Sequence, residues 1–147
     1  MNTPSYISVQ ELAKLVRDPE KQPGVDYAII DVRTDDRHSG YIPGSDNSVT
    51  ADKMHERARA QLVDKYRAVP LVVFHCMMSQ VRGPKSARIY KELVHERLAY
   101  AESSDPQRNQ HVKVLRGGFR EWAEAFLHTE PALVEGFNQD VWEASLW

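Results

Sequence analysis

Short, unbroken apolar runs constrain the fold of this chain more than any other feature of its sequence. Residues 27–32 and 71–74 are dense in apolar and β-branched side chains, and residues 112–115 form a third short run. Strands with one face in water alternate between apolar and polar residues, whereas continuous apolar runs are typical of strands covered on both faces. The sequence therefore predicts strands inside a parallel sheet.

Segments with helical spacing lie between these runs. Ser8 and Glu11 form a capping-box pattern at the start of the first segment, and Pro19 lies just beyond its end. Apolar residues recur at helical spacing in residues 52–66, 84–98 and 119–127. The alternating order predicts an α/β fold with a central parallel sheet and helices on both faces. We expect residues 34–50 to form a long ordered loop, and residues 101–111 to form a polar loop that is the most mobile segment away from the site.

The 147-residue length is typical of a single domain. Residues 131–147 carry several apolar side chains, among them Phe137, Trp142 and Trp147. Such side chains rarely remain in water, so we expect this C-terminal tail to pack on a domain formed by residues 1–130, with the covering of a partner as the alternative.

The bulk composition excludes several classes of partner. The chain has 19 basic and 21 acidic residues, with a formal charge of −2, and this balance gives no reason to expect binding to nucleic acid or to a membrane. One cysteine cannot form an internal disulfide, which fits a reducing compartment. No secretory signal or membrane-spanning run is visible, so we expect a cytoplasmic or nuclear protein. The sequence carries no signal for oligomeric state.

The chemistry of the chain is concentrated after the run at residues 71–74. The single cysteine, Cys76, is followed by a short loop, by Arg82 and by Pro84, where we expect a helix to begin. Loop amides and a helix N-terminus attract anions, and Arg82 presents a fork of donors that matches a tetrahedral oxyanion. The same positive surroundings favour a thiolate. The segment therefore predicts an oxyanion site that contains a nucleophile.

This loop also resembles a known family. Cys76, five intervening residues and Arg82 are similar to the phosphate loop of cysteine-dependent phosphatases. With His75 before the cysteine and Gly83-Pro84 after the arginine, the loop resembles those of the cell-division-cycle dual-specificity phosphatases and the eukaryotic arsenate reductases. Both are built on the rhodanese fold.

Two further segments carry the same resemblance. Residues 28–45, which include Asp31, Arg33 and Asp36, and residues 114–122, which include Gly117-Gly118, are similar to conserved segments of rhodanese-like domains. The three matches occur in the family's order. The resemblance implies a rhodanese-like fold, with residues 1–130 as the catalytic domain.

The resemblance also implies roles for individual residues. Cys76 would attack phosphorus to form a cysteinyl-phosphate that water hydrolyses. The oxyanion would be bound by the loop residues Met77, Met78, Ser79, Gln80, Val81 and Arg82. Asp31 and Arg33 resemble the structural pair that rhodanese-like domains keep near this loop.

Further expectations concern four side chains of the loop, and the absence of a metal site. His75 is expected to be a buried structural histidine with its hydrogen bonds satisfied, and not a base. Met77 and Met78 are expected to shape the mouth of the pocket. The hydroxyl of Ser79 could steady the loop, bond the sulfur or have no specific role. The six histidines show no metal-ligand spacing, so no metal is expected.

The chain departs from the phosphatase pattern in three respects. Gly83 replaces the Ser or Thr that helps to release the thiolate in typical tyrosine phosphatases, and Val81 stands where an acidic residue is found in the cell-cycle enzymes. A general acid would have to come from outside the loop, from Asp35, Asp36 or Asp46, or from the substrate itself. No second cysteine is present to protect Cys76 from oxidation.

These features leave several functions open. The first is a protein-tyrosine or dual-specificity phosphatase that needs no cofactor and acts on a phosphorylated protein. The second is an arsenate reductase, which takes a small oxyanion in the same loop and uses glutathione with glutaredoxin as reductant. Sulfurtransfer is a third possibility, although rhodaneses proper have a loop one residue shorter. A non-catalytic rhodanese-like module is disfavoured by the intact Cys76–Arg82 pair.

Overall fold

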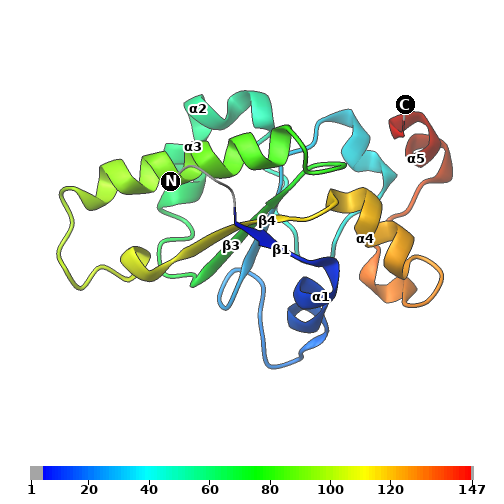
Figure 1. Ribbon diagram of the computed structural model, residues 1–147, viewed down its shortest axis with the longest axis horizontal. Coiled ribbons are helices and arrows are strands. Elements are labelled where there is room, and N and C mark those ends of the chain that lie inside the picture. The colour runs from blue at the N-terminus through cyan, green and yellow to red at the C-terminus, as the bar shows by residue number, and fades with distance from the viewer. Residues whose placement is uncertain (1–4, 147) are drawn as a thin grey trace.

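The computed structural model describes residues 5–146 of the chain (Figure 1). Four strands alternate with helices and single helical turns. In chain order these are β1 (Tyr6–Ile7), α1 (Val9–Arg17), β2 (Ala28–Asp31), η1 (Asp35–Ser39), η2 (Ala51–Lys53), α2 (Met54–Ala58), η3 (Arg59–Val63), β3 (Leu71–His75), α3 (Arg82–Leu98), η4 (Pro106–Asn109), β4 (His111–Leu115), α4 (Gly118–Phe126), η5 (Pro131–Leu133) and α5 (Gln139–Ser145).

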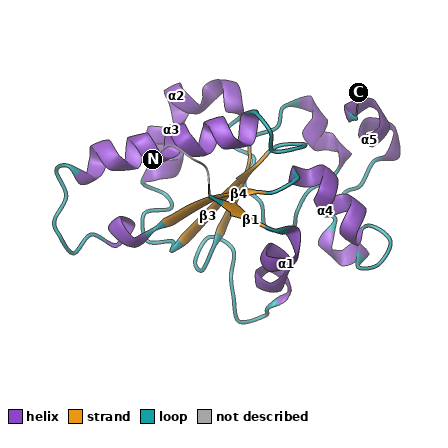
Figure 2. Cartoon of the chain, in the orientation of Figure 1, coloured by secondary structure: helices purple, strands orange, loops and turns teal. Residues whose placement is uncertain are grey.

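The four strands form one parallel sheet in the order β1-β4-β3-β2 (Figure 2). In the centre, Val72 of β3 is in register with Ala28 of β2 on one side and Val112 of β4 on the other. Because all strands run in the same direction, their carboxyl ends share one edge. The segments that follow β2, β3 and β4 therefore emerge close together.

Helices cover both faces of this sheet, with α2 and α3 on one side and α1 and α4 on the other (Figure 1). The side chains of β3 show why both layers are needed. Val72 and Phe74 are buried in the hydrophobic cluster under α2 and α3, whereas Val73 is buried in the cluster against α1 and α4. The predicted α/β fold with a doubly covered parallel sheet is confirmed.

Helix boundaries differ from the prediction in two places. The helix expected to begin at Pro84 begins at Arg82, so Pro84 lies in its first turn, where a missing N–H costs no hydrogen bond. The helical segment predicted for residues 52–66 is divided into η2, α2 and a turn of π-helix, η3. Residues 34–50, predicted as a loop, contain the short 3₁₀ helix η1.

The loop at residues 101–111 is more firmly held than its polar composition predicts. Asp105 and Gln107 are buried. Asp105 accepts a hydrogen bond from Arg97 of α3 at 2.5 Å, and Gln107 Nε2 donates to the carbonyl of Val63 at 3.0 Å. Polar side chains in this loop bind neighbouring elements, and the mobility of the segment stays a prediction.

The C-terminal segment of the described chain lies against η1 and α4. Asn138 N donates to the carbonyl of Ser39 at 2.9 Å, and Tyr41 and Glu135 exchange backbone hydrogen bonds of 2.8 and 2.9 Å. The rings of Trp142 and Phe119 are nearly perpendicular, with 6.1 Å between their centroids. Residues 131–146 thus contact the turn that follows β2. Trp147 lies outside the described residues.

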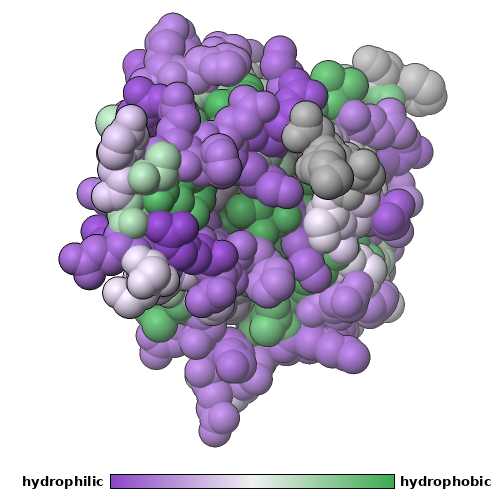
Figure 3. Space-filling view, turned by 60° about the vertical axis from the view of Figure 1, so that its left-hand side comes forward, coloured by the Kyte–Doolittle hydropathy of each residue, from purple (hydrophilic) through white to green (hydrophobic). Residues whose placement is uncertain are grey.

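The molecular surface is largely polar. Figure 3 shows one face, on which hydrophilic residues predominate and hydrophobic residues form small separate patches. Large apolar side chains that are exposed in the described part of the chain are few, and Val81, next to Arg82, is one of them at 70% exposure. Within residues 5–146, no helix combines the length and the apolar character needed to cross a bilayer.

Candidate active site

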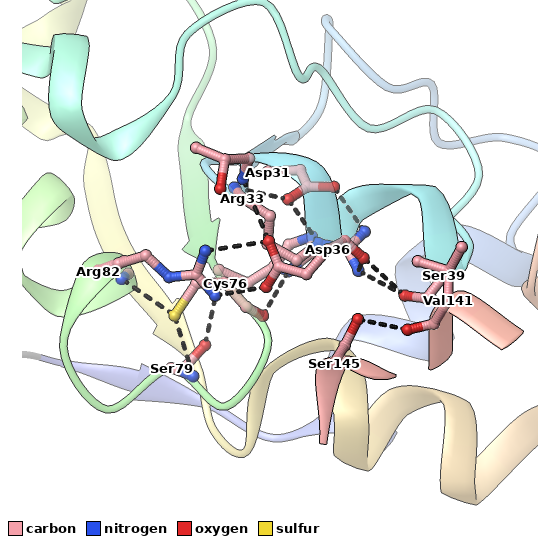
Figure 4. Close-up of polar contacts among 12 residues, drawn as sticks. Asp31, Arg33, Asp36, Ser39, Cys76, Ser79, Arg82, Val141 and Ser145 are labelled. Atoms are coloured by element: carbon pink, nitrogen blue, oxygen red, sulfur yellow. Dashed lines mark hydrogen bonds and ion pairs between the residues drawn. The ribbon is translucent and has the colours of Figure 1, made fainter. Parts of the chain in front are cut away.

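Cys76 directly follows β3, at the carboxyl edge of the sheet, and the loop after it leads into α3 at Arg82. The cysteine is buried, and its Sγ accepts backbone N–H bonds from Ser79 at 3.2 Å and from Gly83 at 3.3 Å (Figure 4). Inward-pointing amides of this kind form an anion-binding cradle. Of the predicted oxyanion-binding residues 77–82, Ser79 thus directs its amide at the sulfur, and Gly83, which the prediction did not include, supplies the second amide.

Ser79 has a specific structural role in the middle of this loop. Its φ is 54°, the single positive φ outside glycine among the described residues. Its Oγ accepts a hydrogen bond from Cys76 N at 3.4 Å while its own N–H points at the sulfur. The left-handed conformation, unfavourable for a residue with a Cβ, is thus stabilised by a contact across the loop. Of the roles considered for Ser79, the hydroxyl takes that of steadying the loop.

The N-terminus of α4 fixes the other side of the loop. Phe119 N donates to the carbonyl of Cys76 at 3.0 Å, and Arg120 N donates to the carbonyl of Met77 at 2.8 Å. A Cβ on Gly118 would lie 2.5 Å from the Met77 carbonyl oxygen and 2.6 Å from that of Cys76. Only glycine permits this approach, which gives a physical reason for the Gly-Gly turn. The sequence showed the turn but not its contact with the loop.

The two methionines of the loop do not both occupy the predicted position. Met77 is buried and packs in the hydrophobic cluster with Phe119 and Trp122, so the prediction that it shapes the pocket mouth is wrong. The carbonyls of Cys76 and Met77 accept hydrogen bonds from the N-terminus of α4, which brings this side chain to the α4 side of the core. Met78 is partly buried against the same cluster.

Asp31 and Arg33 form a fully buried ion pair behind the loop. Arg33 Nε donates to Asp31 Oδ1 at 2.9 Å and Nη2 donates to Oδ2 at 2.8 Å, and neither side chain is exposed. Arg33 also lies over the ring of Phe119, 4.3 Å from its centroid. Burial raises the pKa of Asp31, but the neighbouring His75 together with the hydrogen bonds and charge of Arg33 outweighs burial and lowers this pKa below its usual value. The pair connects the end of β2 with α4.

His75 ends β3 and is completely buried beside Phe119. Its Nδ1 lies 3.1 Å from the carbonyl of Cys76, which can only accept, so the proton of a hydrogen bond must be on Nδ1. Nε2 has no hydrogen-bond partner in residues 5–146, and the expectation of a fully satisfied histidine is therefore wrong. Burial lowers the pKa of His75, which favours a neutral ring.

Arg82, the first residue of α3, binds a carboxylate that the sequence did not single out. Its Nη1 and Nη2 donate to the two carboxylate oxygens of Asp36 at 3.1 and 2.6 Å (Figure 4). Asp36 lies on η1, after β2, and is 46 residues away along the chain. Of the three carboxylates considered as general acids, Asp36 is the one placed at the loop. Asp35, its neighbour, is exposed.

Asp46 is bound elsewhere. Its carboxylate accepts hydrogen bonds from Ser48 N at 2.9 Å, from Lys65 Nζ at 3.0 Å and from the Tyr66 hydroxyl. Burial raises its pKa, but these hydrogen bonds outweigh burial and lower the pKa from 3.8 to about 2. This carboxylate is therefore structural.

The lowered pKa gives a testable dependence of stability on pH. A carboxylate whose pKa is depressed by folding stabilises the folded state above pH 3.8, and this contribution is lost as the pH falls toward 2. Because the group is partly exposed and screened by water, we expect Asp46→Asn to lower the free energy of unfolding by about 1 kcal/mol at pH 6. Urea titrations at several pH values should show the difference from wild type shrinking below pH 3.8, with Asp35→Asn as control. A difference that stays constant down to pH 2 would contradict this role.

A cleft of about 750 Å³ adjoins the loop at Gln80 and Val81 and runs along α3 toward His95. Its floor includes Val112 and Val114 of β4. Neither Cys76 nor Arg82 is among the residues that line it, so the cleft adjoins the loop without opening onto the sulfur. Among residues 5–146, no group of three or more His, Cys, Asp or Glu side chains is arranged to hold a metal ion.

Comparison with known proteins gives a consistent result. Residues 8–125 match the family described as the rhodanese-like domain. The chain is 33% identical to arsenate reductase 2.2 of Oryza sativa subsp. japonica, over 80% of this chain and 81% of that protein. It is 32% identical to the dual specificity phosphatase ibp1 of Schizosaccharomyces pombe, over 86% of this chain and 93% of that protein. Its fold is similar to the As-Sb reductase of Leishmania major, with a TM-score of 0.65, 32% identity, and coverage of 90% of this chain and 85% of that one.

Proposed function

This chain belongs to the rhodanese-like domain family, and on that basis we propose that it is a cysteine-dependent phosphatase of the protein-tyrosine or dual-specificity type. One observation carries the proposal. Cys76 Sγ lies at the floor of a loop whose amides point at it, and the arginine that begins the next helix lies at the same loop. A thiolate nucleophile and the donors for a tetrahedral oxyanion thus share one site.

In the first step, the Cys76 thiolate attacks the phosphorus of a phosphate monoester. A sulfur–phosphorus bond forms, the phosphorus–oxygen ester bond breaks, and the leaving oxygen takes a proton from solvent or from the substrate. In the second step, water attacks phosphorus, the sulfur–phosphorus bond breaks, and phosphate and the thiolate are released. Arg82 and the loop amides stabilise the equatorial oxygens in both steps.

The site is poorly equipped to protonate a leaving group. Residues 77–81 contain no carboxylate, and Asp36 is bound to Arg82. Burial raises the pKa of Asp36, but the hydrogen bonds and charge of Arg82 outweigh it and lower the pKa below its usual value. An ionised carboxylate cannot serve as an acid. We therefore expect phenolic esters, such as phosphotyrosine, to be better substrates than phosphoserine.

An arsenate reductase is the second candidate, since the same features favour it. The arsenate reductase of Oryza is 33% identical to this chain, and a reaction on arsenate needs no acid for an ester oxygen. Cys76 would displace a hydroxyl from arsenate to form a thiol–arsenate adduct. Glutathione would then supply the second thiol, arsenic would be reduced by two electrons, and the resulting mixed disulfide would be reduced by glutaredoxin.

One set of assays separates these functions. The purified protein is given p-nitrophenyl phosphate, arsenate with glutathione and glutaredoxin, and thiosulfate with cyanide, in parallel. We expect the first reaction to have the highest kcat/KM. Arsenate reduction with no hydrolysis of the aryl phosphate would reject the phosphatase in favour of the reductase. Thiocyanate production alone would assign sulfurtransfer and reject both.

Arg82→Lys tests the arginine independently of its charge. Lysine keeps the positive charge but has no planar fork, so it cannot bind two oxyanion oxygens in parallel. We expect kcat/KM for p-nitrophenyl phosphate to fall by about 100-fold, as is typical when one transition-state donor is lost. Arg57→Lys, at an exposed position on α2 outside the cleft, is the control and should have little effect. A nearly normal rate for Arg82→Lys would contradict the proposed role of the fork.

A further inference from the structure

The carboxylate of Asp36 occupies one end of the Arg82 side chain. Both terminal nitrogens of the guanidinium donate to it, Nη1 to Oδ1 and Nη2 to Oδ2 (Figure 4). The two side chains are partly buried, with 35% of Arg82 and 18% of Asp36 exposed. Such a two-point contact fixes the plane of the guanidinium as well as its position.

A guanidinium has more than one edge that can bind an anion. Its five N–H groups form a fork at the end of the side chain and another along its side, where Nε lies next to one Nη. Asp36 uses the end fork. The remaining edge of Arg82 lies near the nucleophile, since Asp36 and, to a smaller degree, the Cys76 sulfur raise the pKa of Arg82. The side fork therefore remains available for a second anion while the first is held.

Asp36 itself is held in place by the turn that carries it. Its backbone carbonyl accepts hydrogen bonds from Ser39 Oγ at 2.8 Å and from Arg33 Nη1 at 3.3 Å. Its Oδ1 also accepts from Thr34 N at 3.2 Å. The buried Arg33 thus hydrogen-bonds to η1, and η1 places the Asp36 carboxylate beside Arg82. A carboxylate so anchored is suited to hold a partner and not to swing away from it.

We propose that Asp36 is a positioning residue, whose carboxylate holds the end of the Arg82 guanidinium so that its side edge is presented to the oxyanion. The inference rests on the proposed function only in that it takes the loop to be an oxyanion site. Asp36 touches the arginine and not the reacting atoms. Because Arg82 contacts the oxyanion both before and during the reaction, loss of Asp36 weakens substrate binding as well as turnover.

Asp36→Asn tests this role, because asparagine keeps the shape of the side chain and removes its charge. Binding of inorganic phosphate is measured by calorimetry, and kcat and KM are measured with p-nitrophenyl phosphate. We expect the phosphate Kd and the KM to rise by about tenfold, the scale of one lost charged hydrogen bond, with a smaller fall in kcat. Asp35→Asn, on the same turn and exposed, should leave both constants unchanged.

Two further measurements separate positioning from a general structural effect. In an Arg82→Met background, Asp36→Asn should change the phosphate Kd no further, since Asp36 acts through the arginine. Asp36→Glu, which keeps the charge, should recover most of the lost affinity. Equal weakening in both backgrounds would overturn the inference, and so would a glutamate variant as weak as the asparagine variant.

Three other outcomes would also overturn the inference. Tighter phosphate binding by Asp36→Asn would make Asp36 a competitor of the oxyanion. If the phosphate Kd and the rate with p-nitrophenyl phosphate were unchanged, but phenyl phosphate, whose leaving group is more basic, were hydrolysed more slowly, Asp36 would be a general acid. An unchanged Kd with unchanged rates would leave it no role. Wild-type protein that binds phosphate but hydrolyses no aryl phosphate would contradict the phosphatase proposal, while the comparison of phosphate Kd values would still decide the role of Asp36.

Discussion

Cys76→Ser should lower the turnover of p-nitrophenyl phosphate by about 10⁴-fold or more, the scale seen when a nucleophile is removed from an enzyme. Serine has nearly the same shape, but its hydroxyl is a much weaker nucleophile and the structure offers no base within the loop to activate it. The oxyanion cradle, by contrast, consists of backbone amides and Arg82, which the substitution does not alter. Stopped and continuous assays at saturating substrate measure the effect.

Binding provides the control for this prediction. Inorganic phosphate should bind Cys76→Ser within a few-fold of the wild-type affinity, because the donors remain in place. Retained phosphate affinity together with lost turnover would show that the variant is folded and lacks only the nucleophile. If the serine variant kept even a tenth of the wild-type rate, Cys76 could not be the nucleophile.

Arg33→Met should have the largest effect on stability. The substitution leaves the Asp31 carboxylate buried without its partner and removes the hydrogen bonds that Arg33 donates to the carbonyl of Gly40 at 2.6 Å and to Ser39 Oγ at 3.2 Å. Breaking a buried ion pair from one side costs about 3–5 kcal/mol, a large part of the stability of a small domain. Urea unfolding at neutral pH measures the difference.

A surface ion pair on the same chain is the matched control. Arg59 binds Glu96 at 2.5 Å, but both side chains are more than 60% exposed. Arg59→Met should therefore cost less than about 1 kcal/mol. Equal effects of Arg33→Met and Arg59→Met would show that burial of the Asp31–Arg33 pair does not matter to the fold.

Much of the fold could be predicted because local patterns determine it. The unbroken apolar run that becomes β3 can bury all its side chains only if helices cover both faces of the sheet. The structure places Val72 and Val73 in different hydrophobic clusters, one on each face. The capping box at Ser8 is formed as predicted, with Glu11 N donating to Ser8 Oγ at 3.1 Å. The loop from Cys76 to Arg82 was recognisable because strand, nucleophile, arginine and helix follow one another directly in the sequence.

The parts that could not be predicted depend on contacts between distant segments. Asp36 meets Arg82 because β2 and β3 end at the same edge of the sheet, and nothing in residues 34–36 distinguishes Asp36 from Asp35. The burial of Met77 follows from the path of the backbone after β3, which residue type alone does not reveal. The unpaired Nε2 of His75 likewise depends on what surrounds it in the core.

The most direct test of the account is detection of the covalent intermediate. The protein is mixed with p-nitrophenyl phosphate, quenched in acid within the first turnovers, digested and examined by mass spectrometry. We predict a phosphoryl group on the peptide that contains Cys76, absent from Cys76→Ser. Turnover with no phosphoryl group on this peptide, or with the group on another residue, would contradict the claim that the Cys76 sulfur attacks phosphorus.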